Sequence, residues 1–504
     1  MRKHFPDFPA FRRLSQKHNC IPVYRQLLAD RLTPVAAFDV LGQDDHAFLL
    51  ESVVGGERIA RYSFLASNPV LVFSCRQGRA TITRPYLPPE EFQTSDPLSD
   101  LQRLLPAVDL YRDPSLPAFT GGLVGYAGYD TIRYYEQDKL ASPPTDDRRL
   151  PDLEFGLYLD LVVFDHVDKT VKVVANAVHR EQASAGGGHE QEAYADACRR
   201  VDAIVARLQQ TPASSLGEVD PRSPLTLACE SNLTKAQFES AVEKGLEYIR
   251  AGDIFQFVPS QRLRVKSSAR AFDVYRALRI INPSPFMFYV KSPACTLIGS
   301  SPEILCRVQD RVVTSRPLAG TRQRGATEAE DQRLEQELLA DPKDRAEHIM
   351  LVDLHRNDVG RVARHGTVKV SDCMTVERYS HVMHISSNVT GALRDDMTSF
   401  DALRVSLPVG TVSGAPKIRA MQIIDEVEPT RRGPYGGAVG YFDLSGSTDT
   451  CIALRTIVHH SGNVYDLQAG AGVVADSVPS SEYEETLNKA KAMLKAVELA
   501  EKGL

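Results

Sequence analysis

The chain has 504 residues, of which 43% are hydrophobic and 25% charged, and its formal net charge is −6. These proportions are typical of a globular protein of two to four ordinary domains or one large composite unit. The mixed-sign charge excludes nucleic acid as a main partner, and no apolar run approaches the roughly 18 residues that span a bilayer. Eight scattered cysteines without CxxC or zinc spacing, and an N-terminus without the apolar stretch of a secretory signal, predict a cytoplasmic protein with reduced thiols.

The first half of the chain reads as short strands followed by a helix. Segments 70–75 and 79–83 flank Gln77-Gly78, which predicts a hairpin, and 153–178 predicts a second hairpin. Residues 192–210 have helical periodicity, and the polar stretch 211–224 that follows is typical of a linker. We therefore expect an N-terminal domain over 1–215 and a second domain over 225–504.

The second half alternates strands with helices, which indicates an α/β fold. An amphipathic helix is expected over 233–253, ending at Gly252, and Asp341-Pro342 is a clear helix start. The last helix is predicted from near Ser481 to about Glu501, with Ser481 and Glu484 as a capping box. Segments 119–130 and 435–443 share the pattern GG-x-VGY, which indicates either related strand positions in the two halves or two independent kinks.

Residues 408–441 are unusually dense in glycine and proline. Glycine loses much conformational entropy on folding, so such a density is useful mainly where backbone N–H groups approach a bound anion. Three carboxylates lie around this segment. Glu347 falls on the apolar face of its helix, and Glu482 and Glu485 share one face of the last helix. The latter two fit either ligands or acids favoured by a helix N-terminus.

The remaining candidates point to an anionic ligand. A carboxylate-only set suits Mg²⁺, which is completed by substrate oxygens and water. Gly470-Ala471-Gly472 offers backbone donors after a predicted strand, and Arg455 in an apolar run needs an anionic partner. Glu303 and His384 are possible acid and base groups, although a lone histidine in an apolar strand is more often a core residue.

Seven sequence blocks together resemble the chorismate-utilising enzymes, and among them the large subunits of anthranilate synthases, over roughly 30–500. The blocks are 252–262, 301–305, 316–322, 346–358, 408–421, 435–441 and 470–485. The resemblance implies a large α/β (α+β) unit in which both halves of the chain share antiparallel sheets packed as a sandwich and surrounded by helices. It also implies a Mg²⁺-dependent lyase that converts chorismate and ammonia to anthranilate and pyruvate, the first step of tryptophan biosynthesis.

The same resemblance implies a role for each candidate residue. Glu347 and Glu485 would bind Mg²⁺ directly and Glu482 through water. Glu303 would protonate the departing C4 hydroxyl, His384 would remove the C2 proton with loss of pyruvate, and Gln256 and Thr411 would complete the catalytic set. The substrate-binding residues implied are Gly320, Thr321, Tyr435, Arg455, Gly470, Ala471 and Gly472.

Two positions bear on the type of chorismate enzyme. Relatives that add water carry a lysine base where this chain has Gln256, and aminodeoxychorismate-forming relatives usually carry a lysine nucleophile where it has Ala319. Component I of aminodeoxychorismate synthase remains the alternative. A non-catalytic amino-acid sensor would have no use for Glu303, Glu347 and Arg455, and a phosphate-binding protein would need a P-loop pattern that the chain lacks.

The resemblance also implies two partners besides chorismate. No part of the chain resembles a glutaminase, so a separate glutamine amidotransferase subunit would supply ammonia, in a heterotetramer. L-tryptophan would act as a feedback inhibitor bound by Ser52, Pro285, Phe286 and Met287, with Cys451 nearby. Without the resemblance, the apolar members of this set would be assigned to the core.

Overall fold

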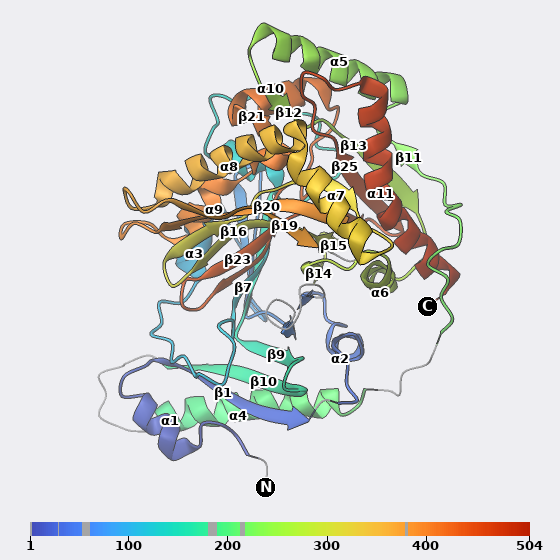
Figure 1. Cartoon of the computed structure of the whole chain (residues 1–504). Helices are drawn as coiled ribbons and strands as arrows, with labels where there is room; N and C mark the ends of the chain where they lie inside the picture. The colour runs from blue at the N-terminus through green and yellow to red at the C-terminus, as the bar shows by residue number, and fades with distance from the viewer. Residues whose placement is uncertain are drawn as a thin grey trace.

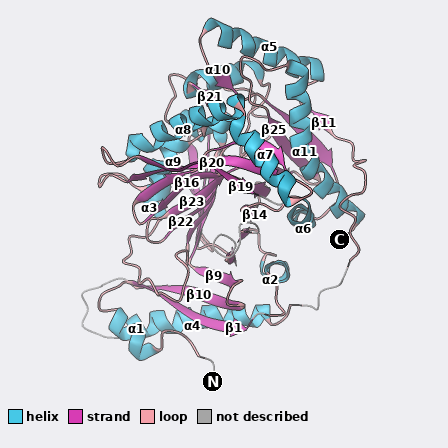
Figure 2. Ribbon diagram, in the orientation of Figure 1, coloured by secondary structure: helices cyan, strands magenta, loops and turns pink. Residues whose placement is uncertain are grey.

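The computed structural model describes residues 3–28, 30–52, 61–179, 189–211, 217–378 and 382–503. Two large antiparallel sheets form the centre of the molecule, and helices cover their outer faces (Figures 1 and 2). This confirms the expected α/β sandwich. Within the described residues, no helix combines the length and the apolar character needed to cross a membrane.

The first sheet has eleven strands and takes them from both halves of the chain. Their order is β1 (Cys20–Leu28), β10 (Thr170–Val178), β9 (Asp160–Asp165), β3 (Tyr62–Ser67), β2 (Ala47–Glu51), β14 (Phe286–Lys291), β15 (Thr296–Ser301), β24 (Thr456–His460), β25 (Val464–Gly470), β13 (Ser260–Lys266) and β11 (Glu230–Ser231).

The second sheet has twelve strands and is mixed in the same way. Their order is β18 (Leu318–Gln323), β20 (Val382–Ala392), β17 (Val312–Ser315), β16 (Ile304–Gln309), β23 (Thr448–Ile452), β22 (Ala438–Asp443), β7 (Gly122–Ala127), β8 (Leu153–Tyr158), β4 (Leu71–Arg76), β5 (Arg79–Thr83) and β6 (Glu90–Gln93), and β19 (Lys369–Arg378) pairs with β20. A separate pair joins β12 (Gln256–Phe257) to β21 (Gly414–Ala415).

Helices cover each sheet on the side away from the other. On the eleven-stranded sheet lie α1 (Phe8–Leu14), α2 (Pro34–Leu41), α4 (His189–Leu208), α6 (Ala271–Ile281) and α11 (Pro479–Lys502). On the twelve-stranded sheet lie α3 (Pro97–Leu104), α7 (Glu328–Ala340), α8 (Pro342–Val362) and α9 (Ser399–Ser406). The remaining helical segments are α5 (Lys235–Ala251), α10 (Lys417–Val427), η1 (Tyr129–Tyr134) and η2 (Gly410–Val412).

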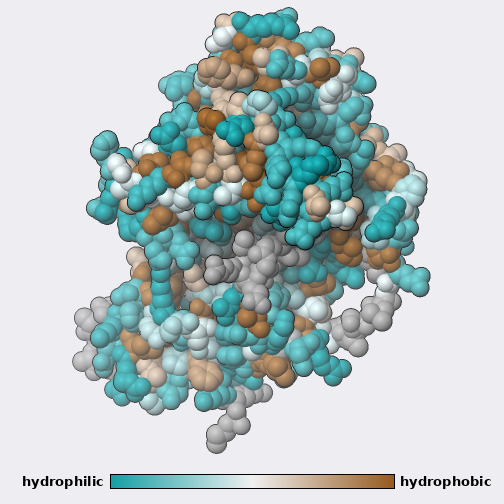
Figure 3. All heavy atoms as spheres, in the orientation of Figure 1, coloured by the Kyte–Doolittle hydropathy of each residue, from teal (hydrophilic) through white to brown (hydrophobic). Residues whose placement is uncertain are grey.

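The sheets face each other through apolar side chains. Phe48 and Val163 from the first sheet pack with Val124 and Tyr158 from the second. Farther along, Phe288 packs with neighbours from both sheets in the same layer. In the view of Figure 3 the surface mixes polar and apolar residues, with brown spheres gathered over the region of α8, where Ile349 is 56% exposed.

Several elements agree with the sequence prediction and one does not. The hairpin at Gln77-Gly78, the helix that ends at Gly252 and the helix that starts at Asp341-Pro342 are all present. The expected second hairpin is present, because β9 and β10 pair antiparallel, but its first strand is shorter than predicted, since residues 153–158 form β8 of the other sheet. The capping box at Ser481 is wrong, because α11 begins two residues earlier and its N-cap, Val478, has no side-chain cap.

Candidate functional site

One cavity of about 720 Å³ brings together segments that are far apart in the sequence. It lies where α8 and the first turns of α11 meet β18, β20 and the ends of β12, β15 and β25. The predicted site residues that line it are Gln256, Glu303, Gly320, Thr321, Glu347, His384, Thr411, Tyr435, Arg455, Gly470, Gly472, Glu482 and Glu485. Ala471 is the exception, because it is fully buried and its N–H donates to the carbonyl of Pro259 at 3.1 Å.

The three predicted metal ligands come from two helices. Asp341 caps α8 by accepting from the N–H groups of Lys343 and Asp344, and this start places Glu347 on the helix face toward the cavity. Glu482 and Glu485 lie in the first two turns of α11. The structure therefore brings acids from both helices to one side of the cavity.

Electrostatics indicate that these acids interact. Burial raises the pKa of Glu347, and the neighbouring carboxylates of Asp344 and Glu485 raise it further. Burial also raises the pKa of Glu482, with Glu485 acting in the same direction. Lys489 Nζ lies 2.7 Å from a carboxylate oxygen of Glu485 and counters part of this repulsion. Acids that repel one another in a half-buried site favour a bound cation.

The donor set fits a hard divalent cation that is completed by other ligands. All three candidate donors are carboxylates, which Mg²⁺ prefers. In the described part of the chain, no three acidic, histidine or cysteine side chains lie close enough together to hold a metal ion alone. Mg²⁺ bound here would therefore need oxygen atoms from the substrate and from water, which is its usual coordination in phosphate and carboxylate sites.

Glu303 lies at the end of β15, in the turn to β16, and is 4% exposed. Burial raises its pKa to about 8, opposed in part by the Leu318 amide and the nearby Thr411 hydroxyl. At neutral pH this carboxyl group is therefore mostly protonated and can donate a proton.

His384 lies on β20 with its Nδ1 2.9 Å from the carbonyl of Gly320 and 3.1 Å from the hydroxyl of Thr321. A carbonyl oxygen can only accept, so Nδ1 carries the proton and Nε2 is the basic nitrogen. Burial lowers the pKa of His384, and Arg455 lowers it further, so the ring is neutral at pH 7. Gly320 has a φ of +61°, which allows its carbonyl to turn toward the ring.

The opposite side of the cavity is built from backbone. A Cβ on Gly470 would come within 2.8 Å of the Pro259 carbonyl and 3.1 Å of the Tyr435 hydroxyl, and one on Gly472 within 2.8 Å of Gln256 Nε2. Arg455 has a φ of 46°, a left-handed backbone conformation that is costly outside glycine and concentrates at functional sites. This side can therefore approach an anionic ligand closely with main-chain and guanidinium groups.

A buried ion pair that the sequence did not reveal holds this backbone in place. Arg432 and Glu428 are both buried and form a salt bridge on one turn after α10. Arg432 donates to the carbonyls of Val412 and Val258, each at 2.6 Å, and Glu428 accepts from the N–H and hydroxyl of Ser260 at 2.8 Å. The pair fixes η2, which carries Thr411, and the segment directly after β12, the strand that carries Gln256.

Other lining residues were also missed, since all but Met493, which looks like a core residue, are ordinary surface-type residues in sequence. They are Arg322, Lys343, Asp344, Gln468, Lys489 and Met493. The i,i+4 spacing of Glu485, Lys489 and Met493 along one face of α11 was the available signal for two of them.

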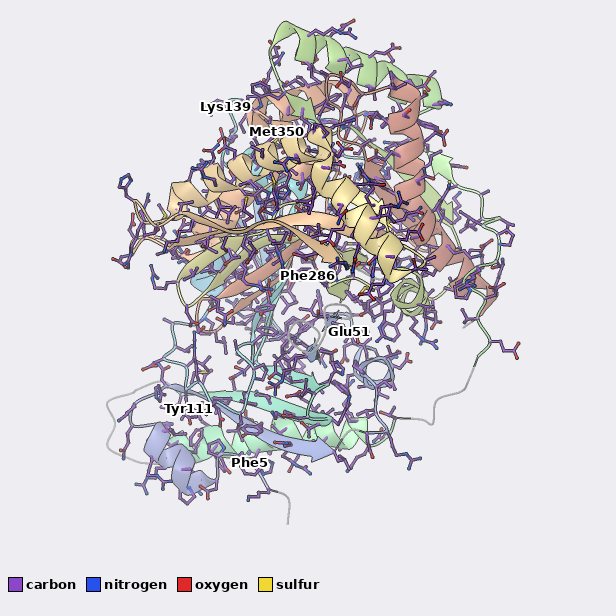
Figure 4. The ribbon with its side chains drawn as sticks, in the orientation of Figure 1. Phe5, Glu51, Tyr111, Lys139, Phe286 and Met350 are labelled. Atoms are coloured by element: carbon purple, nitrogen blue, oxygen red, sulfur yellow. The ribbon has the colours of Figure 1, made fainter. Side chains whose placement is uncertain are left out.

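A second cavity of about 230 Å³ lies between the two sheets and is lined by Ser52, Pro285, Phe286, Met287 and Cys451. Figure 4 labels Phe286 and Glu51 in the central region, and both of them line this cavity. The Ser52 hydroxyl is buried and has no hydrogen-bond partner among the described residues. The predicted inhibitor-binding residues thus share one cavity, apart from the larger one.

Comparisons with known proteins give consistent results. The model of the family described as chorismate binding enzyme matches residues 45–495. The chain is 45% identical to anthranilate synthase component 1 of Acetivibrio thermocellus, over 98% of this chain and 99% of the relative, and 47% identical to the Acinetobacter calcoaceticus protein of that name, over 97% of each. The crystal structure of anthranilate synthase component I from Streptococcus pneumoniae is 36% identical, has a TM-score of 0.76, and covers 93% of this chain and 98% of that one.

Proposed function

The chain belongs to the family of chorismate-binding enzymes, and we propose that it is a lyase that converts chorismate and ammonia to anthranilate and pyruvate, the first step of tryptophan biosynthesis. The observation that carries the proposal is a single cavity with a protonated acid, a neutral histidine and carboxylates from two helices. The relatives named anthranilate synthase component 1, aligned along nearly the whole chain, support the same choice.

The first half-reaction adds ammonia at C2 and removes the C4 hydroxyl. Glu303 gives its proton to that hydroxyl, which leaves as water while the C2–N bond forms, and the added nitrogen then releases one proton. The raised pKa of Glu303 suits it to this step. Mg²⁺ bound by Glu347 and Glu485, with Glu482 through water, would neutralise the ring carboxylate.

The second half-reaction makes the ring aromatic. His384 Nε2 takes the C2 proton, the bond from the ring to the enolpyruvyl oxygen breaks, and pyruvate leaves after gaining a proton. The hydrogen bond from Nδ1 to Gly320 orients the ring for this role. Tyr435, Arg455 and the backbone at Gly470 to Gly472 would hold the enolpyruvyl carboxylate, and Gly320 and Thr321 the ring. The amide of Ala471 would have to leave the Pro259 carbonyl to take part.

Two side chains favour free ammonia as the nucleophile. Ala319 lines the cavity and has no group that could attack C2, and the neutral amide of Gln256 cannot take a proton from water. Chorismate and Mg²⁺ incubated with ammonium should therefore give fluorescent anthranilate and an equal amount of pyruvate. Aminated product without pyruvate would favour aminodeoxychorismate synthase instead.

Ammonia would come from a separate glutamine amidotransferase subunit in a heterotetramer. The name component 1 shared by the relatives supports a second component. The same assay with glutamine in place of ammonium should give no anthranilate until the amidotransferase subunit is added. Turnover of glutamine by this chain alone would reject the proposed partner.

Feedback inhibition by L-tryptophan at the second cavity completes the proposal. The Ser52 hydroxyl has no hydrogen-bond partner in the described part of the chain, and together with the apolar wall of Pro285, Phe286 and Met287 it suits an amino acid with a large aromatic side chain. Met287 pairs with Ser300 of β15, and the Ser300 N–H donates to the carbonyl of Arg455 at 3.2 Å. The strand β15 therefore lies between Met287, in the wall of the second cavity, and Arg455, which would bind the enolpyruvyl carboxylate. Activity that stays unchanged up to millimolar L-tryptophan would reject this part.

A further inference from the structure

Glu377 lies directly opposite His384 where β19 and β20 pair antiparallel. Residues that face each other in this way point to the same side of a sheet, with their Cβ atoms about 4.5–5.5 Å apart. Thr375 and Ser386 form the next such pair, and their hydroxyl oxygens lie 3.2 Å apart. The register therefore places the side chain of Glu377 next to that of His384, the proposed base.

The two side chains point away from α7 and α8, which cover the other face of β20 (Figure 1). Side chains alternate along a strand. Met383 and Ile385, on either side of His384, pack with Leu338 of α7. His384 and Glu377 therefore share the face that is turned from the helices, and His384 lines the large cavity there.

An ion pair crosses β20 on this face. Arg316 lies between β17 and β18, which pair with the edge of β20 opposite β19. The hydroxyl of its neighbour Ser315 lies 2.5 Å from Nδ1 of His355 on α8, so alternation turns Arg316 to the other face. Arg316 pairs there with Glu377, and their side chains are 29% and 21% exposed. The guanidinium group thus holds the carboxylate next to His384.

The second half-reaction creates a positive charge where the surroundings disfavour it. When His384 takes the C2 proton, its neutral ring becomes an imidazolium. Burial is the main cause that lowers the pKa of His384, and Arg455 lowers it further. The Gly320 carbonyl and Glu377 raise it, and of these two only Glu377 carries a negative charge. A nearby carboxylate favours the charged form of a histidine.

Apart from Arg455 and the neutral Glu303, the charged groups that line the cavity lie on β18 and in the first halves of α8 and α11. They are Asp341, Asp344, Glu347, Glu482 and Glu485 among the acids, and Arg322, Lys343 and Lys489 among the bases. Arg322 pairs with both aspartates, and Lys489 pairs with Glu485. Bound Mg²⁺ would neutralise the glutamates. Glu377 is thus the acid on the strand next to His384.

We propose that Glu377 is a positioning residue for the second half-reaction, and that its carboxylate stabilises the imidazolium formed when His384 Nε2 takes the C2 proton. The electrons of the C2–H bond enter the ring as the bond to the enolpyruvyl oxygen breaks. Glu377 exchanges no proton in this step and does not touch the substrate. The inference rests on the proposed function and adds a residue to one of its two steps.

Glu377→Gln removes the charge and keeps the shape of the side chain. An assay with ammonium follows chorismate consumption, the aminated intermediate and pyruvate, separated by chromatography. The first half-reaction uses Glu303 and not His384, so chorismate consumption should stay within about twofold. Pyruvate release should fall about tenfold, which corresponds to a loss of about 1.4 kcal/mol of stabilisation in one step. The aminated intermediate should therefore accumulate.

Glu335→Gln is the matched control. Glu335 of α7 pairs with Arg378, the residue after Glu377, on the helix-covered face of the same strand. Its side chain is 26% exposed, close to the value for Glu377, and the variant likewise takes one carboxylate from one guanidinium group. It should change none of the three measured quantities.

Glu377→Asp keeps the charge and should release pyruvate at least about threefold faster than Glu377→Gln. Thermal melts check that all three variants are folded. A purely structural role of the ion pair would slow both half-reactions together, so the ratio of intermediate to pyruvate separates the two roles.

Three results would overturn the role of Glu377. They are equal slowing of both half-reactions in Glu377→Gln, accumulation of the intermediate in Glu335→Gln as well, and pyruvate release in Glu377→Asp no faster than in Glu377→Gln. In each case the unmodified protein would still make anthranilate, and the proposed function would stand. If the unmodified protein itself gave aminated product without pyruvate, the proposed function would be rejected, and the role of Glu377 with it.

Discussion

At the scale of single residues, the protonation of Glu303 should control the pH dependence of turnover. Its pKa is raised to about 8 by burial, so the proton-donating form is present below that pH and is lost as the pH rises through it. We expect kcat to fall above about pH 8 when the concentration of free ammonia is held constant. A pH profile that stays flat to pH 9 would contradict the assignment.

Glu303→Gln should remove the proton donor while keeping the shape of the side chain. General acid catalysis contributes roughly 10²- to 10⁴-fold, and we expect kcat to fall within that range with little change in the KM for chorismate. Steady-state anthranilate fluorescence measures both constants. Loss of chorismate binding with an unchanged kcat would instead indicate a positioning role.

The residues with unusual local sequence were the ones that could be predicted. Glu347 on an apolar helix face, Arg455 in an apolar run and the glycines near Gly470 each break a local rule, and all of them line the cavity. Arg432 and Glu428 could not be found this way, because two charged residues four apart look like an ordinary exposed pair. Only the tertiary packing of η2 and β12 around them buries the pair.

At the scale of elements, α5 is packed so closely on β12 that adding one methyl group between them should destabilise the protein. A Cβ on Gly245 would lie 1.8 Å from a ring carbon of Phe257, whose side chain is fully buried beside Gln256. Gly245→Ala should therefore lower the free energy of unfolding by about 1–3 kcal/mol. Gly360→Ala, at an α8 position with open space, is the control in urea unfolding.

The buried face of α8 predicts a specific sensitivity to acid. Burial lowers the pKa of His355 to about 3, and its Nδ1 lies 2.5 Å from the Ser315 hydroxyl. The unfolded chain binds a proton at this residue below about pH 6.5 but the folded chain does not, so stability falls as the pH drops. Between pH 6.5 and 5 this histidine should cost about 2 kcal/mol.

His355→Asn tests this expectation, because asparagine can still reach a hydroxyl and does not titrate. The variant should be less stable at pH 7 and lose less stability on acidification, as measured by urea unfolding at both values. Equal slopes for the two proteins would show that other groups account for the acid sensitivity.

Elements with a local start and stop signal were predictable, and the path of the chain between sheets was not. Thr234 and Gln237 form a capping box and Gly252 has a φ of +83°, so local sequence signals predict both ends of α5. The run from Leu153 to Asp165 is mostly apolar, since both of its strands are buried, and its three acids do not mark the point where one strand ends and the next begins. Periodicity alone cannot reveal that the chain changes sheet at Leu159.

At the scale of the whole molecule, the repeated GG-x-VGY pattern lies at the centre of the twelve-stranded sheet. β7 and β22 pair antiparallel, with Gly125 opposite Gly440 and Tyr126 opposite Val439. A Cβ on either glycine would come within about 2 Å of a carbonyl on the next strand, so both must be glycine. The halves of the chain thus meet through equivalent strands, which supports the reading of the pattern as related positions.

The expected boundary between 1–215 and 225–504 leads to the last prediction. Both sheets take strands from each side of it, and β2 and β14, or β7 and β22, are neighbours across it. A fragment 225–504 would expose the edges of β14 and β22 and the apolar layer between the sheets, so it should not unfold cooperatively on its own.

Coexpression of 1–215 with 225–504 supplies the missing strands. We expect the two fragments to copurify, to melt in one transition and to form anthranilate with ammonium, while 225–504 alone aggregates or melts without a transition. Calorimetry and the fluorescence assay measure both properties. If 225–504 alone melted sharply and were active, this part of the chain would fold and function without the strands of 1–215. The chain would then consist of two independently folding domains.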